Sequence, residues 1–401
     1  MTPKGGSDRA SALSGVRVVE LGQLIAGPYA ATLLGYFGAE VIKVEPPKGD
    51  PIRGWRGIDE DGTSLWWRSL ARNKKSVAID LNDPRGQDLV RQLILESDVL
   101  IENFRPGTLE RWNLDPSVLQ NQRPDLIVAR VSGYGQTGPR GSQPGYASVC
   151  EAYGGLRHLT GMPGEPPVRS NLSVGDTLAG LHTAIGILVA LFHRQRSGTG
   201  QLVDTAIYEA VFSCLESVVP EYDRLGIVRG PSGSTITGVV PTGTYACSDG
   251  KGVVMGANGE AVFRRLCDAM GDPALADDPR FAGNEARVAH QAELEATIDA
   301  WFAGRTAAEA VVALMEAKVP CSPIYDAADM FADPHYVARE QLERPVDGGA
   351  AVGAIAPKLS ATPGRTERLG PELGAHTAEV LRELGVDDAG LRELWADAVV
   401  R

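Results

Sequence analysis

Cysteine is scarce in this chain. Five cysteines occur among 401 residues, at Cys150, Cys214, Cys247, Cys267 and Cys321, and no two of them form a CxxC pair. Neither a disulfide framework nor a zinc site is therefore expected. Scattered thiols of this kind are typical of a reducing compartment, so we expect a cytoplasmic protein.

The short motifs of several enzyme classes are also missing. The sequence has no HExxH, no histidine pair at helical spacing, no GxxxxGK[ST] phosphate loop and no GxSxG elbow. Metal ligation, P-loop phosphate chemistry and a serine nucleophile on an elbow therefore have no support. We expect no bound metal and interpret the six histidines as structural.

Positive charge is in deficit. The formal net charge is -12 and the isoelectric point is near 5.1. This charge argues against nucleic acid as a partner, because phosphate binding depends on clustered lysine and arginine. The opening residues MTPKGGSDRASALSG are polar, which argues against a secretory signal. The longest apolar run, AGLHTAIGILVALF, is short for a bilayer span and contains His182, so no membrane is expected.

Strand-like and helix-like segments alternate over the first third of the chain. Apolar, β-branched runs predict strands at residues 16–20, 40–45, 76–81, 99–103 and 125–132. Helical patterns lie between them, from Pro28 to Gly38 and over residues 85–98. This βαβ order predicts an α/β domain with a largely parallel sheet.

The composition and the predicted secondary structure change at two further points of the chain. A helical pattern begins at Ala147, and a nearly all-apolar helix over residues 177–198 is expected deep in the core. Residues 225–255 are rich in Gly, Ser and Thr with short strands, helices dominate over 260–317, and a strand-like VPCSPIYD follows. We therefore divide the chain into a large domain at 1–224, a small domain at 225–330, and a linker with a terminal helix, at 331–401, that returns to the large domain.

A dinucleotide motif after the fifth strand is misleading. Gly133, Gly135 and Gly138 spell GxGxxG. That fingerprint must open a helix so that the pyrophosphate meets the helix N-terminus. Here Pro139 and Pro144 follow at once, so we predict a loop and no nicotinamide cofactor.

Asp176 stands out because of its setting. In SNLSVGDTLAG it follows Gly175 and precedes the apolar helix. Either it caps the helix, or, beside backbone donors in a dry site, it acts as a carboxylate nucleophile. The glycine-rich GANGEA at Gly256 to Ala261 is a candidate donor loop, although a plain strand-to-helix turn would have the same sequence.

Several segments together resemble one family, the class III CoA-transferases. They are LSGVRVVELGQLIAGPYAATLLGYFGAEVIKVEPPKGD, RNKKSVAIDLNDPRG, ENFRPGTLERW, SGYGQTGP and VGDTLAGLHTAIGILVAL, in the family's order. The resemblance implies a large Rossmann-like domain, a smaller α+β domain and an interlocked homodimer. It also implies that Asp176 forms an anhydride and then a thioester with CoA, and that backbone N–H groups near Gly256 and Gly259 bind the oxyanions.

The resemblance carries over further positions. Ile79 to Asn82 resemble the family's adenine-binding stretch, Asn103 and Arg111 its CoA-contacting residues, and Tyr146 a tyrosine of the active site. Coenzyme A and acyl-CoA are then substrates, with no tightly bound cofactor.

Departures from formyl-CoA transferase, one member of the family, make formate and oxalate doubtful substrates. Ile25 replaces its glutamine, Ala147 its acid after the tyrosine, and Pro46–Pro47 its arginine pair. Lys48 and Arg53 are possible substitutes for phosphate contact.

Two other functions stay open. The α-methylacyl-CoA racemases share these blocks but carry a histidine base where this chain has Tyr146, and a CoA-binding module without catalysis has no sequence signature against it. For transfer, the segments are closer to the glutarate-type enzyme, so we expect succinyl-CoA as donor and a dicarboxylic acid as acceptor. Arg72, Arg169 or Arg53 would bind the acceptor carboxylate.

Overall fold

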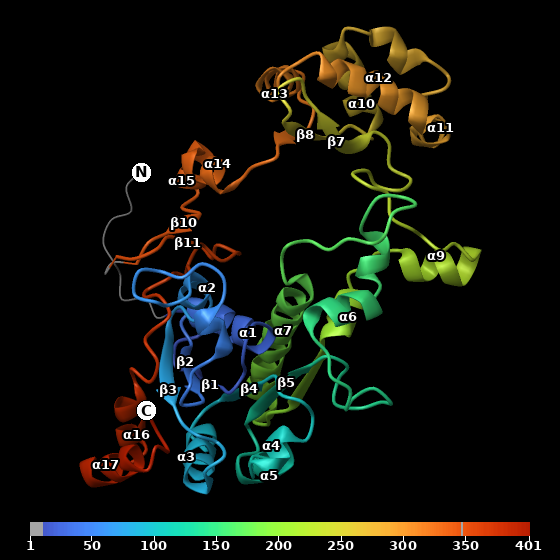
Figure 1. Ribbon diagram of the computed structural model, residues 1–401. Coiled ribbons are helices and arrows are strands. Elements are labelled where there is room, and N and C mark those ends of the chain that lie inside the picture. The colour runs from blue at the N-terminus through green and yellow to red at the C-terminus, as the bar shows by residue number, and fades with distance from the viewer. Residues whose placement is uncertain (1–10, 346–347) are drawn as a thin grey trace. The chain divides into compact units, whose positions relative to one another are not determined.

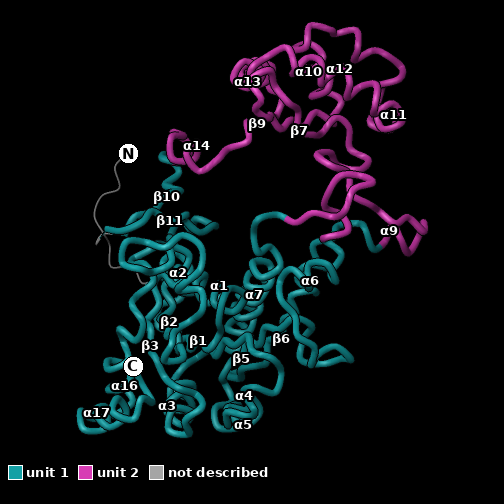
Figure 2. Tube along the Cα trace, viewed as in Figure 1, with its two compact units in different colours: residues 1–156, 170–219, 337–401 teal, residues 157–169, 220–336 magenta. Residues whose placement is uncertain are grey.

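Segments far apart in the sequence assemble into two units in the computed structural model, which describes residues 11–345 and 348–401. The large unit comprises residues 1–156, 170–219 and 337–401, and the small unit residues 157–169 and 220–336 (Figure 2). The division falls at 220 and 336 where 225 and 330 were expected, and 157–169 joins the small unit without a signal in the sequence. The polar opening through residue 10, and residues 346–347 of the expected linker, lie outside the described residues.

A six-stranded parallel sheet forms the centre of the large unit (Figure 1). Its strands lie in the order β3 (Lys74–Ala78), β2 (Glu40–Glu45), β1 (Arg17–Glu20), β4 (Val99–Glu102), β5 (Ile127–Ser132) and β6 (Leu202–Ala206). The expected α/β architecture is confirmed, and this strand order is that of the doubly wound dinucleotide-binding folds. Strand β6 was not expected.

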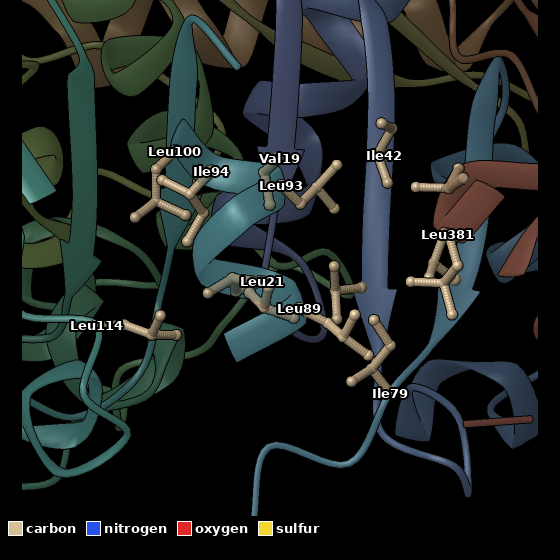
Figure 3. Packing of buried hydrophobic residues seen from close by; sticks show 14 of the residues in the cluster. Val19, Leu21, Ile42, Ile79, Leu89, Leu93, Ile94, Leu100, Leu114 and Leu381 are labelled. Carbon is tan, nitrogen blue, oxygen red and sulfur yellow. The ribbon is translucent and has the colours of Figure 1, made fainter. Parts of the chain in front are cut away.

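Alternate residues of each strand enter separate cores, because successive side chains of a strand point to opposite faces. Val19 packs with α3 (Pro84–Leu95) and the C-terminal helices α16 (Thr377–Glu383) and α17 (Asp388–Ala396), as Figure 3 shows for Leu89, Leu93 and Leu381. Val18 packs on the other face with α1 (Ala26–Tyr36) and α7 (Val174–Ser197). Both faces of the sheet are therefore covered.

Helix α7 differs from its prediction in two ways. It begins at Val174, so Asp176 lies within its first turn and not before it. It is also not buried all round: one face of five apolar residues is exposed, at Leu181, Ile185, Leu188, Val189 and Phe192. By length and composition α7 could cross a membrane, but its opposite face packs against α1 and the sheet of a folded domain.

Shorter elements complete the large unit and its junctions with the small one. They are η1 (Pro51–Gly54), α2 (Leu65–Leu70), α4 (Thr108–Arg111), α5 (Pro116–Gln122), α6 (Ala147–Tyr153), η2 (Leu156–Leu159), α8 (Ile207–Phe212), α9 (Val218–Leu225), α15 (Pro334–Ala338), β10 (Leu342–Glu343) and β11 (Val352–Gly353).

The small unit is α+β, as expected. Its antiparallel sheet has the order β7 (Thr242–Ala246), β8 (Gly252–Gly256) and β9 (Cys321–Pro323). Its helices are α10 (Glu260–Met270), η3 (Pro273–Asp277), α11 (Asn284–Ala289), α12 (Gln291–Ala303), α13 (Ala307–Glu316) and α14 (Ala327–Ala332). Strands β7 and β8 and helices α10, α12 and α13 share one apolar core.

Four buried charged side chains join the first three strands. The Glu20 carboxylate, at the end of β1, contacts Lys43 Nζ at 2.8 Å and Lys74 Nζ at 2.7 Å, and Lys43 also contacts Asp50 at 3.0 Å. Burial raises the pKa of Glu20, but the two ammonium groups outweigh it and hold that pKa below its ordinary value. Burial lowers the pKa of Lys74 to about 8.

Replacing one member of this cluster leaves the others uncompensated. We expect Glu20→Gln to lower the free energy of unfolding by about 3–5 kcal/mol, the usual cost of breaking a buried ion pair. Arg91→Ala, which breaks an exposed pair with Asp88, is the control and should cost about 0.5 kcal/mol or less. Urea unfolding followed by circular dichroism measures both free energies. Equal losses would show that the buried cluster stabilises the fold no more than an exposed ion pair does.

Candidate active site

One cavity of the large unit, of about 330 Å³, contains several of the predicted residues. Its wall is formed by the turn after β1, the loop after β4, the end of β5 and the segment before α6, with Asp176 from α7. Strands β1 and β4 are neighbours at the point where the strand order reverses. Ligands of open α/β sheets bind at the carboxyl ends of the strands at this switch point. The cavity therefore lies where the fold favours a ligand site.

Asp176 is the third residue of α7. The N-cap residue, Ser173, makes no side-chain cap hydrogen bond, and the N–H of Gly175 instead donates to Glu151 Oε1 at 3.0 Å. A side chain at Gly175 would lie 3.1 Å from Glu151 Cγ and 3.3 Å from Ile207 Cγ2, so the glycine permits close packing at this helix end. The first turn of a helix also carries the positive end of its dipole, which favours the ionised carboxylate.

Two side chains hold the turn between β1 and α1, which lines the same cavity. Asn103 Oδ1 accepts the N–H of Gln23 at 2.7 Å, and Asn103 Nδ2 donates to the Gln23 carbonyl at 2.7 Å. Leu24 has the left-handed φ of 63°, a strained conformation for a branched residue, and donates its N–H to Asp50 Oδ2 at 3.2 Å. The same N–H also lies 3.3 Å from Asp50 Oδ1, and because Asp50 belongs to the buried charge cluster, the cluster reaches the cavity wall through this donor.

Helix α1 begins directly after this turn. Its N-cap, Ile25, offers no side-chain cap bond, and Ile25 and Ala26 both line the cavity. The first N–H groups of a helix have no partner inside the helix. This end of α1 can therefore donate backbone hydrogen bonds to an anion in the cavity.

Tyr146 caps the start of α6 and is 68% exposed at the cavity. Its position depends on the glycine motif after β5: a Cβ at Gly133 would lie 2.8 Å from the Cα of Gly145. No helix follows Gly133 until Ala147. The expectation that GxGxxG does not open a helix here is confirmed, and Gly133 permits a close backbone contact.

Cys150 is a buried thiol close to residues that line the cavity. Its sulfur lies 3.3 Å from the Gly133 carbonyl, to which it donates. Burial first, and then the charges of Asp176 and Glu151, raise the pKa of Cys150 to about 11. At neutral pH it stays a thiol and does not compete as a nucleophile.

Other predicted CoA residues do not line the cavity. Ile79 is 1% exposed and lies in the core that Figure 3 shows, so its side chain cannot contact a ligand. Only its backbone could contribute to the predicted adenine binding. Asn82 is exposed and donates to Asp80. Arg111 donates to Thr108 Oγ1 at 2.9 Å and forms no ion pair with the described residues. Lys48 is exposed beyond β2.

Two arginines proposed for the acceptor or for phosphate are already occupied. Arg53 forms a bidentate pair with Glu45, at 2.7 and 2.8 Å, and stacks over Trp67. Arg72 is 7% exposed and donates to Ser69 and to the Gly353 carbonyl. Both guanidinium groups therefore bind within the fold, and the structure gives neither candidate support as a substrate ligand. Arg169 lies in the small unit.

The glycine loop is part of the small unit. Gly256 ends β8, and Gly259 is the N-cap of α10 with no side-chain cap bond. Locally it is a strand-to-helix turn, the alternative that the sequence left open, and its helix end offers backbone donors.

The cavity residues that were not predicted include Gln23, Gln143 and Arg105. Gln23 lies two residues before Ile25, which occupies the position of the glutamine in formyl-CoA transferase. Arg105 lies two residues after Asn103 in ENFRPG, so the motif that identified Asn103 also contains this cation. Arg105 forms no ion pair within the described part of the chain. Among the described residues, no three histidine, cysteine or carboxylate side chains lie together so that they could hold a metal ion.

The chain is similar to known proteins over nearly its whole length. Residues 13–377 match the profile of CoA-transferase family III. The chain is 48% identical, over 97% of its length and 98% of the relative's, to succinyl-CoA–D-citramalate CoA-transferase of Chloroflexus aurantiacus. It is 44% identical to the α subunit of succinyl-CoA–L-malate CoA-transferase of Chloroflexus aurantiacus, over 96% and 91%. A CaiB/BaiF family protein of Brucella suis superimposes with a TM-score of 0.85 at 33% identity, covering 94% of this chain and all of the other. The chain is therefore a member of CoA-transferase family III and an enzyme of that class.

Proposed function

We propose that this enzyme moves CoA from succinyl-CoA to a dicarboxylic acid through covalent intermediates on Asp176. The observation that carries the proposal is the position of that carboxylate, in a cavity at the switch point of the sheet that is also lined by Ile25 and Ala26 at the start of α1. Family membership supports the transfer of CoA, and the cavity supports the choice of nucleophile.

The steps conserve every atom. A carboxylate oxygen of Asp176 attacks the thioester carbonyl, the C–S bond breaks, and a mixed anhydride and CoA thiolate result. The thiolate attacks the aspartyl carbonyl, which releases succinate and leaves an aspartyl-CoA thioester. The acceptor carboxylate then attacks that thioester, and the returning thiolate takes the acceptor acyl group and restores Asp176.

Each attack creates an oxyanion. The first N–H groups of α1, at Ile25 and Ala26, are donors that need no reorganisation when charge develops. The family resemblance implies a second source in the helix-end donors at Gly259 of the small unit. Backbone donors suit a reaction that passes through tetrahedral intermediates on both the substrate carbonyl and the aspartyl carbonyl.

The racemase alternative lacks a base. Proton abstraction next to a thioester carbonyl needs an acid and a base on opposite sides of the carbon. Among the described residues that line the cavity, the ionisable ones are Arg105, Tyr146 and Asp176, and none is a histidine. A single carboxylate suits nucleophilic catalysis better.

The names of the relatives suggest the acceptor. Citramalate and malate are 2-hydroxydicarboxylates of five and four carbons, and we propose an acceptor of this class. An anionic substrate needs a cationic partner. Arg105 is exposed at the cavity without an ion pair to another described residue, so we assign it this part in place of Arg53 and Arg72.

We further propose a cytoplasmic homodimer. Five apolar side chains at helical spacing form the exposed face of α7, from Leu181 to Phe192. An exposed apolar face of this kind marks an interaction surface. An interlocked dimer, as the family resemblance implies, would cover it.

Removal of the nucleophile is the direct test of function. Asp176→Asn keeps the size of the side chain but cannot form the anhydride, so CoA transfer from succinyl-CoA to D-citramalate or L-malate should fall by about 10³-fold or more. Transfer is measured by separating the acyl-CoA products. Undiminished transfer in a folded Asp176→Asn protein would refute the mechanism, and epimerised thioester without transfer would favour the racemase.

Loss of the Asn103 clamp should weaken substrate binding. Asn103→Ala releases both hydrogen bonds to Gln23, so we expect the KM for succinyl-CoA to rise about tenfold, the equivalent of one to two lost hydrogen bonds. Asn121→Ala, an exposed asparagine of α5, is the matched control and should leave KM unchanged. Equal KM values in the two variants would show that Asn103 does not contribute to substrate binding.

A charge on the exposed face of α7 should disturb the dimer. Ile185 is 58% exposed in one chain, and Ile185→Glu is expected to shift the sedimentation coefficient toward that of a monomer, because a buried charge without a partner is costly. Val312→Glu, at 57% exposure on α13, is the control. A monomeric wild-type protein would contradict the proposal.

A further inference from the structure

A second carboxylate is buried behind Asp176. Glu151, in α6, is 3% exposed, and its Oε1 accepts the N–H of Gly175 at 3.0 Å. A buried carboxylate is costly unless hydrogen bonds compensate it. The residue before Asp176 is therefore held by a charged group that the proposed mechanism does not use.

The start of α7 has the sequence of a capping box without its geometry. Ser173 at the N-cap and Asp176 at the third position fit the pattern in which a hydroxyl and an acid satisfy the first turn. Two other helices of this chain form complete boxes, α13 with Thr306 and Glu309 and α14 with Asp326 and Asp329. In α7 the Ser173 side chain makes no cap bond. A carboxylate from another helix, 24 residues away in the sequence, binds the first turn instead.

Packing fixes that carboxylate in place. A Cβ at Gly175 would lie 3.1 Å from Glu151 Cγ, 3.3 Å from the Ala147 carbonyl and 3.3 Å from Ile207 Cγ2. Helices α6 and α8 thus meet the first turn of α7 at one glycine. The charges of Asp176 and Glu151 both act on the Cys150 thiol, which agrees with two carboxylates close together.

We propose that Glu151 is a positioning residue, which caps the first turn of α7 so that the Asp176 carboxylate stays directed at the substrate. The inference rests on Asp176 being the nucleophile. Without Glu151 the Gly175 N–H loses its acceptor, and the carboxylate nearest to it in sequence is that of Asp176. A carboxylate drawn back to cap its own helix is a weaker and misplaced nucleophile.

The test measures acylation of Asp176 directly. The enzyme is mixed with succinyl-CoA in a quench-flow instrument, the aspartyl thioester is trapped with hydroxylamine, and mass spectrometry quantifies the modified peptide. We expect Glu151→Ala to slow acylation about 30-fold with the KM for succinyl-CoA little changed, because misplacement and not binding is affected. Glu151→Gln keeps a carbonyl acceptor and should recover most of the rate.

Glu309→Ala is the matched control, because it removes a cap from α13 in the small unit. It should lower the melting temperature without slowing acylation. If Glu151→Ala lowers the melting temperature but acylates at the wild-type rate, Glu151 is only structural and the inference is wrong. Should the alanine variant not fold, Glu151→Asp, one methylene shorter, takes its place, and wild-type acylation by it overturns the inference. Absence of the adduct from the wild-type enzyme would instead refute Asp176 as nucleophile.

Discussion

The carboxylate of Glu20 is the constraint on which the site depends. It lies at the end of the central strand β1 and holds the ammonium groups of Lys43 and Lys74, which come from the next two strands. Lys43 in turn binds Asp50, and Asp50 accepts the N–H of Leu24 in the cavity wall. Since a buried charge needs all its partners, the strand ends and the turn before α1 are fixed relative to one another.

Two segments that line the cavity are held by side chains from elsewhere in the fold. Asn103 and Asp50 hold the turn that precedes α1. Glu151 holds the first turn of α7, which carries Asp176. Both segments use non-local side chains where a local cap would be simpler. In the proposed mechanism the nucleophile and its oxyanion donors must keep their separation through four successive attacks, and such non-local contacts favour that.

Much of the fold was predictable because local patterns determined it. The alternation of apolar strands with amphipathic helices identified five of the six strands of the parallel sheet, and the change of texture near residue 225 identified the α+β unit. Strand β6 was missed because its first residues are partly exposed and its pattern is polar at Asp204. Helix α7 was expected to be buried all round, since an apolar face that another chain would cover has the same composition as one that the core covers.

The site was predictable only where family motifs marked it. Asp176, Asn103 and Tyr146 share the cavity as expected. The sequence does not show that Glu45 and the Gly353 carbonyl already bind Arg53 and Arg72, two of the three candidates for the acceptor carboxylate. Glu151 was missed for the same reason, since its partner lies 24 residues away on another helix. Pairings between distant elements are a property of the packed fold.

Isotope transfer tests the central claim most directly. The acceptor acid is labelled with oxygen-18 in the carboxylate that receives CoA, and the enzyme, first converted to its CoA thioester, completes a single turnover with it. Attack of the labelled carboxylate on the aspartyl carbonyl, followed by cleavage of the anhydride by CoA thiolate at the acceptor carbonyl, must leave one heavy oxygen atom on Asp176. Mass spectrometry should find that atom in the peptide containing Asp176. Labelled acyl-CoA formed with no label on this peptide would show that the acids exchange CoA without the aspartate, and the account would be wrong.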